Sequence, residues 1–173
     1  MKTTKSKGTI LKIDLSKAFD KVSWSYIKLL ITHLGFEVPF IKCIMAYISS
    51  VSFTVLINAV ASPFFTSEKG LLQGCPLSPL LFLLLLVAEG LSRALISAIN
   101  TADFQGIKTS PDLRITHLLF MDDVLILSSG RKRDVETLAT ILQLFQDATG
   151  MIINSQKSTL SLIGIDEATM ALY

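Results

Sequence analysis

Two adjacent carboxylates, Asp122 and Asp123, separate two strongly apolar, strand-like runs at residues 115–121 and 124–127. Two such runs joined by a two-residue connector predict a tight β-hairpin with the carboxylates at its tip. Asp tolerates turn conformations, so a purely structural role is one interpretation. A turn does not require two like charges side by side, however, where each raises the cost of ionising the other. A divalent cation would remove that repulsion, and hard cations such as Mg²⁺ prefer carboxylate oxygens, so a metal site is the competing interpretation.

A third carboxylate, Asp14, also comes directly after an apolar run. Residues 9–13 predict a first strand that ends beside Asp14. If this strand and the hairpin are neighbours in one sheet, the three carboxylates meet at one edge of it. Carboxylates so placed can hold two Mg²⁺ ions roughly 3.5–4 Å apart, an arrangement that stabilises the attacking and leaving oxygens in phosphoryl transfer.

The rest of the chain alternates between helical and strand-like periodicity. The first half predicts a strand at 9–13, a helix from Ser23 or Ser25 to Gly35, a helix from Pro39, and a hairpin of 51–57 with 64–66. A long buried helix from Ser78 through Leu95 follows. The second half predicts the hairpin at 115–127, a helix that Asp134 caps and Gly150 ends, and a last hairpin of 151–153 with 159–163. This order predicts an α+β fold, an antiparallel sheet with helices packed on one face.

Composition narrows the class of protein. The chain has 173 residues, of which 50% are hydrophobic and 17% charged, against roughly 25% charged in an average globular protein. This composition excludes intrinsic disorder, and the net charge of +2 is too small to indicate nucleic-acid binding by itself. The excess of apolar residues predicts a surface that a further domain, a partner or self-association would cover. The two cysteines indicate neither a disulfide framework nor a zinc site.

Targeting signals are sparse. The apolar stretch at residues 80–88 is shorter than the roughly 20 residues that a membrane span needs, so no membrane partner is expected. The polar N-terminus does not resemble a signal peptide, which predicts an intracellular rather than a secreted protein.

Four segments, in order, resemble the motifs of the reverse transcriptase palm domain of non-LTR (LINE-type) retrotransposons, and a plant-like member is expected. They are KIDLSKAFDKV at 12–22, GLLQGCPLSPLLF at 70–82, THLLFMDD at 116–123, and 145–158 with Gly150, Asn154, Lys157 and Ser158. The resemblance implies a polymerase palm with a ferredoxin- or RRM-like core. It also implies an RNA-directed DNA polymerase that transfers a dNTP to a primer 3′-hydroxyl, with an RNA template, a DNA primer and dNTP as partners and two Mg²⁺ ions as cofactors, for which Mn²⁺ can substitute.

The resemblance also implies roles for single residues. Asp14, Asp122 and Asp123 match the catalytic, metal-binding carboxylates, and Lys157 matches a catalytic lysine that protonates the pyrophosphate leaving group. Substrate-binding roles fall on Phe19, the gate against a ribonucleotide 2′-hydroxyl, and on Gln73 and Gly74, which lie along the incoming nucleotide and template. Without the resemblance, Phe19 would fit a core position and Lys157 a solvated surface position. Asp20, next to the gate, fits a structural role at a helix start.

Two residues depart from the family pattern. Leu72 stands where an Arg usually precedes the Gln-Gly pair, which removes a guanidinium able to bind phosphate. Met121 replaces a common Ala, a change that retroviral relatives tolerate.

The expected domain organisation is a polar remnant at 1–8, a palm at 9–164 and a tail at 165–173, with fingers and thumb largely absent. Whether such a chain is an enzyme therefore stays open at this point. One interpretation is an active palm that a partner with fingers and thumb, or self-association, would complete. The second is a truncated, inactive remnant that folds and at most binds nucleic acid weakly, and the third is a structural α+β interaction module. The family implies a nuclear location.

Overall fold

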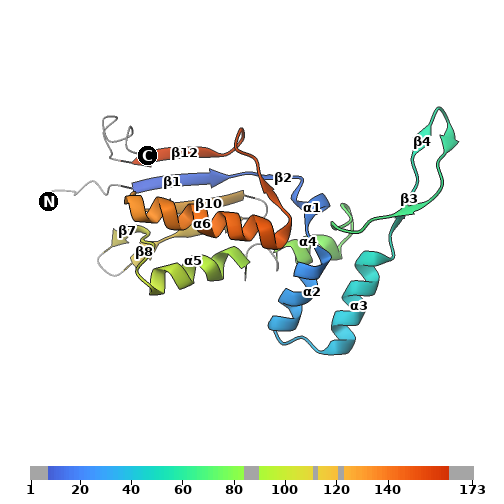
Figure 1. The fold of residues 1–173 in the computed structure, drawn as a ribbon, viewed down its shortest axis with the longest axis horizontal. Helices are drawn as coiled ribbons and strands as arrows, with labels where there is room; N and C mark the ends of the chain where they lie inside the picture. Colours follow the sequence, from blue (N-terminus) through green and yellow to red (C-terminus); the bar gives the residue numbers. More distant parts are fainter. Residues whose placement is uncertain (1–7, 84–89, 111–112, 121–122, 164–173) are drawn as a thin grey trace.

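A four-stranded antiparallel sheet forms the centre of the fold (Figure 1). The computed structural model describes residues 8–83, 90–110, 113–120 and 123–163. The strand order is β12-β1-β10-β9, in which the strands span Thr159–Ile163, Gly8–Ile13, Asp123–Ser128 and His117–Phe120 respectively. Two helices, α5 (Leu91–Asn100) and α6 (Lys132–Thr149), share one hydrophobic core with the sheet. The predicted α+β fold is thereby confirmed.

The two faces of the sheet differ in burial because side chains alternate along each strand. Ile13, Val124 and Ile126 are buried on the helix-covered face, under apolar residues that recur at helical spacing along α5 and α6. Lys12 and Leu118 belong to the opposite face and are exposed. We call this the open face, because Lys12 and Leu118 are exposed on it in the described part of the chain.

A helical pair, α2 (Trp24–His33) and α3 (Val38–Ser49), follows the short helix α1 (Ala18–Lys21). The hydroxyl of Ser23 accepts a hydrogen bond from the backbone N–H of Tyr26, so Ser23 rather than Ser25 is the N-cap of α2. Gly35, with φ of +81°, follows the last turn in the left-handed conformation that glycine adopts at low cost. The predicted boundaries of α2 are confirmed, as is the predicted start of α3, which has Pro39 in its first turn.

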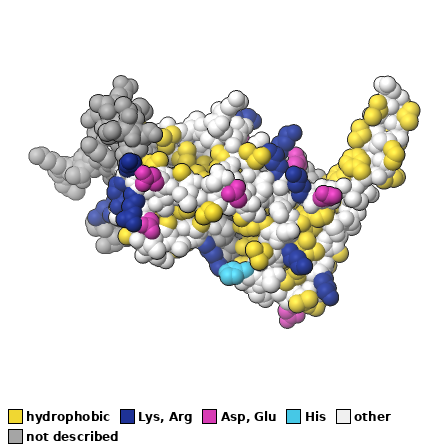
Figure 2. All heavy atoms as spheres, viewed as in Figure 1, with side chains coloured by type: hydrophobic (Ala, Val, Ile, Leu, Met, Phe, Trp, Pro, Cys, Tyr) yellow, Lys and Arg dark blue, Asp and Glu magenta, His cyan; other side chains and the backbone are white. Residues whose placement is uncertain are grey.

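An extended arm, residues 52–66, projects away from the rest of the molecule (Figure 1) and carries many hydrophobic side chains (Figure 2). It consists of four two-residue strands, β3 (Ser52–Phe53), β4 (Leu56–Ile57), β5 (Val60–Ala61) and β6 (Phe65–Thr66), which pair as β3-β6 and β4-β5. The predicted hairpin exists, but its first strand is interrupted, because Ser62 bonds to Thr54 and to the backbone of Val55 between the two ladders.

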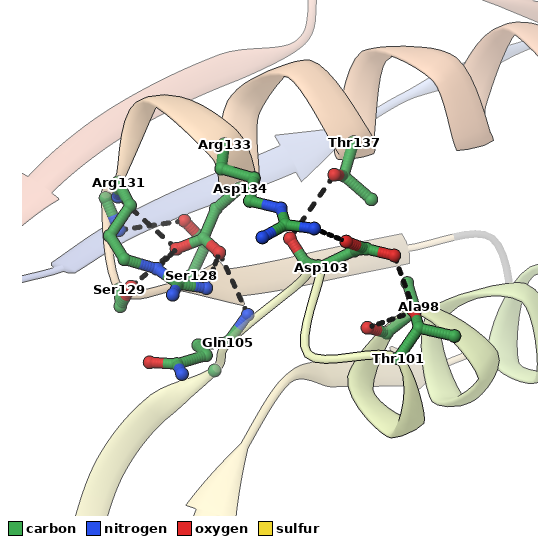
Figure 3. Close-up of polar contacts among 12 residues, drawn as sticks. Ala98, Thr101, Asp103, Gln105, Ser128, Ser129, Arg131, Arg133, Asp134 and Thr137 are labelled. Atoms are coloured by element: carbon green, nitrogen blue, oxygen red, sulfur yellow. Dashed lines mark hydrogen bonds and ion pairs between the residues drawn. The ribbon is translucent and has the colours of Figure 1, made fainter.

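Polar side chains hold the start of α6 to the loop before β7 (Figure 3). The buried carboxylate of Asp134 accepts hydrogen bonds from the backbone N–H of Gln105, the hydroxyl of Ser129, and the backbone and guanidinium of Arg131. The expectation that Asp134 is the N-cap was wrong, since the N-cap is Arg131 and Asp134 lies at the third helical position. From there its carboxylate reaches back to the free N–H of the cap.

Two further expectations need correction. The run at 115–121 is divided, because Ile115 ends a strand β8 (Leu113–Ile115) that pairs with β7 (Ile107–Ser110), whereas His117 begins β9. The final hairpin is absent, because β11 (Ile152–Ile153) pairs with β2 (Leu15–Ser16) and β12 pairs with β1. Both errors arise because strand periodicity does not identify the partner of a strand.

The predicted long helix is only partly within the described residues. The structure describes α4 (Leu77–Leu83) and α5, and residues 84–89 between them lie outside the described part. Leu81 is buried as predicted, but Leu80 is exposed. In the part of the chain that the structure describes, no helix is long and apolar enough to cross a membrane.

Candidate active site

The pairing register of β1 and β10 brings two predicted carboxylates together. The last paired residues at this end of the two strands are Ile13 and Val124. The next residue on each strand is Asp14 and Asp123 respectively, so the two lie opposite each other at one end of the sheet. Since Val124 is buried on the helix-covered face, the alternation along β10 places the exposed Asp123 on the open face, while Asp14, just past the end of β1, is half-buried.

The second strand of the hairpin, β10, begins at Asp123, one residue earlier than predicted. Asp123 pairs with Phe120, so it belongs to β10 and not to the connector. The two residues between Phe120 and Asp123 are Met121 and Asp122, which lie outside the described residues. The location of the predicted ligand Asp122 is therefore not described.

The backbone of Asp14 is held by a turn that comes from the far end of the sequence. Its N–H donates to the hydroxyl of Ser158 (3.1 Å), and its carbonyl accepts from the N–H of Asn154 (2.9 Å). The side chain of Asn154 in turn accepts from the N–H groups of Gln156 and Lys157. The first and fourth motifs thus form one unit that places the exposed Lys157 in the turn next to Asp14.

A cation already accompanies one of the carboxylates. The Nζ of Lys12 lies 3.2 Å from Oδ1 of Asp123. Lys12 is two residues before Asp14 on β1, and alternation therefore puts it on the same open face. Apart from the position of Lys12 in the strand, no sequence pattern predicts this ion pair.

The described candidate ligands are carboxylates, which fit a hard divalent cation. Asp14 and Asp123 supply carboxylate oxygens at one sheet edge, and the ammonium group of Lys12 shows that this edge accepts positive charge. Within residues 8–83, 90–110, 113–120 and 123–163, no group of three or more potential ligands forms. A complete metal site would need Asp122 in addition.

The second motif is tied directly to the first. The N–H of Leu71 donates to the carbonyl of Phe19 (2.6 Å), and the N–H of Gly70 donates to that of Val22 (2.8 Å). The indole of Trp24 donates to the carbonyl of Gly70 at 2.7 Å. These bonds fix the half-buried Phe19 beside the segment that leads to Gln73.

Glycine at position 70 is required by close approach. Its φ is +86°, and a Cβ there would lie 2.7 Å from the backbone oxygen of Asp20. Gly74 also has a positive φ, +84°, but a Cβ there would meet no described atom within 4 Å, so neighbouring backbone requires glycine at position 70 and not at position 74. The side-chain amide of Gln73 donates to Oδ1 of Asp20 at 3.1 Å, a contact across 53 positions that sequence spacing did not reveal.

Leu72 and Cys75 flank the Gln-Gly pair. Leu72, at the position of the usual Arg, is 41% exposed and offers no charge. Cys75 is buried, and a hydrogen bond from the Tyr47 hydroxyl is the main factor that lowers its pKa to about 7. The N–H of Leu77 also donates to its sulfur (3.4 Å) at the start of α4.

Solved structures share this fold. The apo telomerase of Candida tropicalis, truncated from its C-terminal domain, matches with a TM-score of 0.68 at 15% identity, over 96% of this chain and 32% of that one. The telomerase of Candida albicans in complex with a fragment of telomeric RNA matches with a TM-score of 0.66 at 14% identity, over 93% and 28%. The fold of this chain is therefore shared with part of these telomerase chains.

The chain belongs to the reverse transcriptase (RNA-dependent DNA polymerase) family, whose profile matches residues 1–169. Two Pol polyproteins of the type-1 retrotransposable element R2 from Popillia japonica are 28% and 31% identical to it, each over 86% of the chain. The resemblance to non-LTR retrotransposon reverse transcriptases is thereby confirmed. The chain spans 23% and 20% of the length of these two relatives. A plant-like origin stays a prediction.

Proposed function

We propose that this chain is the palm of a LINE-type RNA-directed DNA polymerase, which joins a dNTP to a primer 3′-hydroxyl on an RNA template. The observation that carries the proposal is the register that puts Asp14 opposite Asp123, with the turn at 154–158 bonded to Asp14. Membership of the reverse transcriptase family and the fold shared with RNA-bound telomerase support a nucleic-acid template as partner. A nuclear location follows from the same proposal.

The proposed reaction is an in-line displacement at the α-phosphorus of the dNTP. The primer 3′-oxygen forms the new P–O bond as the bond to pyrophosphate breaks, and the proton of the hydroxyl is lost. Two Mg²⁺ ions, when bound, supply Lewis-acid stabilisation of the attacking and leaving oxygens.

In this reaction, residues of the chain would position the substrates and neutralise the charge that develops on the phosphate. Asp14 and Asp123, with Asp122, would hold the ions, and Lys157 would give a proton to the leaving pyrophosphate. Phe19 would exclude a 2′-hydroxyl, and Gln73 and Gly74 would line the nucleotide. Catalysis of this kind consists of positioning and electrostatic stabilisation.

Primer extension tests the proposal. The chain is incubated with an RNA template, a DNA primer and dNTP in Mg²⁺ or Mn²⁺, beside Asp14→Asn and Asp123→Asn variants shown to be folded by circular dichroism. Incorporation that both substitutions abolish would support the proposal. Equal incorporation by the wild type and the variants would contradict it.

The exposed Leu72 favours a second candidate, a remnant that folds but does not catalyse. An uncharged side chain at this position leaves the triphosphate without the cation that the family usually supplies. On this candidate the folded wild type shows no incorporation. If Leu72→Arg then restores it, the missing guanidinium is a cause of the inactivity.

A further inference from the structure

We propose that Lys12 is a resident counter-cation of the carboxylate site, which a divalent metal ion must displace from Asp123 and which therefore sets the metal affinity of the site. The inference rests on the proposed function, because it takes Asp14 and Asp123 as metal ligands. It assigns a role to a side chain for which the motifs gave none.

The first step is the charge balance at this end of the sheet. The register ends with Ile13 opposite Val124, so the flanking residues Asp14 and Asp123 are neighbours at this end of the sheet. Adjacent carboxylates repel, and in the absence of metal a nearby cation lowers that cost. The Nζ of Lys12 stands 3.2 Å from Oδ1 of Asp123, at ion-pair distance.

The second step is the fixed origin of Lys12. It lies on β1, which is paired on both sides, opposite Leu125 of β10 and Thr159 of β12. A strand held by two neighbours presents its side chains at a fixed register. The ammonium group therefore approaches Asp123 from a defined position, two residues from Asp14.

The third step is the ease of displacement. The side chains of Lys12 and Asp123 are 49% and 57% exposed, so the ion pair is solvated and weak. The long lysine side chain can turn into solvent at little cost. A metal ion bound to Asp123 at about 2.0–2.1 Å would take the oxygen that Lys12 now contacts and would repel its charge. Lys12 thus competes with the metal without blocking the site permanently.

Manganese titration of the metal-free protein, followed by the electron paramagnetic resonance signal of free Mn²⁺, tests this inference without any need for activity. Lys12→Met removes the charge and keeps a similar length, and should tighten Mn²⁺ binding about fivefold. Lys12→Arg keeps the charge and should bind like the wild type. Lys42→Met, an exposed position on α3, is the matched control and should not change the affinity.

The outcomes separate the inference from the proposed function. If the wild type binds Mn²⁺, Asp123→Asn abolishes binding and Lys12→Met leaves the dissociation constant unchanged, the role of Lys12 is wrong and the metal site stands. If neither the wild type nor Lys12→Met binds Mn²⁺, the proposed metal site is contradicted, and so is the proposed role of Lys12. Binding by Lys12→Met alone would support the inference in its strongest form. Lys12→Gln provides a second uncharged variant if Lys12→Met does not fold.

Discussion

The backbone N–H of Asp14 donates a hydrogen bond to the hydroxyl of Ser158, 144 positions later in the chain. The carbonyl of the same residue accepts from the N–H of Asn154. Both polar groups of the Asp14 backbone are therefore satisfied by one turn. The conformation of a predicted metal ligand thus depends on a segment from the far end of the fold.

Removal of the Ser158 hydroxyl should weaken this connection. Ser158→Ala leaves a partly buried N–H without its acceptor, so the free energy of unfolding should fall by about 1 kcal/mol. Urea unfolding measures the change. Ser155→Ala alters an exposed serine in the same turn and serves as the control. Equal stability of the two variants would show that the bond to Asp14 contributes nothing.

The contact between Asp20 and Gln73 should appear as an energetic coupling. Because the bond is exposed, a double-mutant cycle of Asp20→Ala and Gln73→Ala should give a coupling of about 0.5 kcal/mol in thermal or urea unfolding. Asp20→Asn keeps a hydrogen-bond acceptor and should retain most of the coupling energy. Asp147 bonds to Gln143 and not to Gln73, so the cycle of Asp147→Ala with Gln73→Ala should be additive. Full additivity in the first cycle would argue against a link between the two motifs.

The stability of the protein should depend on the ionisation of Asp134. Burial alone would raise its pKa, but the Arg131 guanidinium, the Ser129 hydroxyl and the backbone N–H of Gln105 together hold the pKa of Asp134 below its ordinary value. Since the folded-state pKa is the lower one, the contribution is present above the unfolded value of about 3.9 and is lost as the pH falls through the folded pKa.

Asp134→Asn should therefore reduce the unfolding free energy by about 3 kcal/mol at neutral pH, since it leaves Arg131 without its partner carboxylate. The difference from the wild type should shrink as the pH falls below about 4. Glu136→Gln, in an exposed ion pair with Lys132, should change stability by less than about 1 kcal/mol. A difference between Asp134→Asn and the wild type that stays constant with pH would contradict the ionisation argument.

The apolar arm should govern self-association. The side chains of Ile57 and Val60 are paired across β4 and β5 and are 63% and 70% exposed. The double substitution Ile57→Lys with Val60→Glu puts opposite charges on a cross-strand pair, which preserves the hairpin. Sedimentation velocity should show less oligomer than for the wild type, with an unchanged melting temperature. Leu29→Lys on α2, also well exposed, is the control for added surface charge. An unchanged oligomer distribution would exclude the arm as the contact surface.

The sequence predicted those features that depend on local patterns. The helices at 24–33 and 38–49 follow from apolar spacing with Ser23 and Gly35 at the ends, and β10 follows from its apolar run. The carboxylates were found because Asp14 and Asp123 each border such a run. Their mutual position was not predictable, since it depends on the register between strands that are far apart in the sequence.

Other features of the site needed tertiary information. The contacts from Ser158 to Asp14 and from Gln73 to Asp20 cross 144 and 53 positions, and no local signal marks them. The requirement for glycine at position 70 arises from the backbone of Asp20, which only the fold brings near. The exposure of the arm was also not predictable, because alternation of apolar residues indicates a strand but not a core that covers it.

The central place of β1 in the sheet has a consequence for how the protein is made. Its partners come late in synthesis, since the bonded residues Thr9 and Ser128 are 119 positions apart. At about 5–20 residues per second, β1 would wait roughly 6–24 s on the ribosome before β10 follows it. During that time an apolar strand stays without a partner, which favours slow folding and chaperone binding. The candidate catalytic centre would then form only after Ser158, whose hydroxyl bonds to Asp14, has emerged as well.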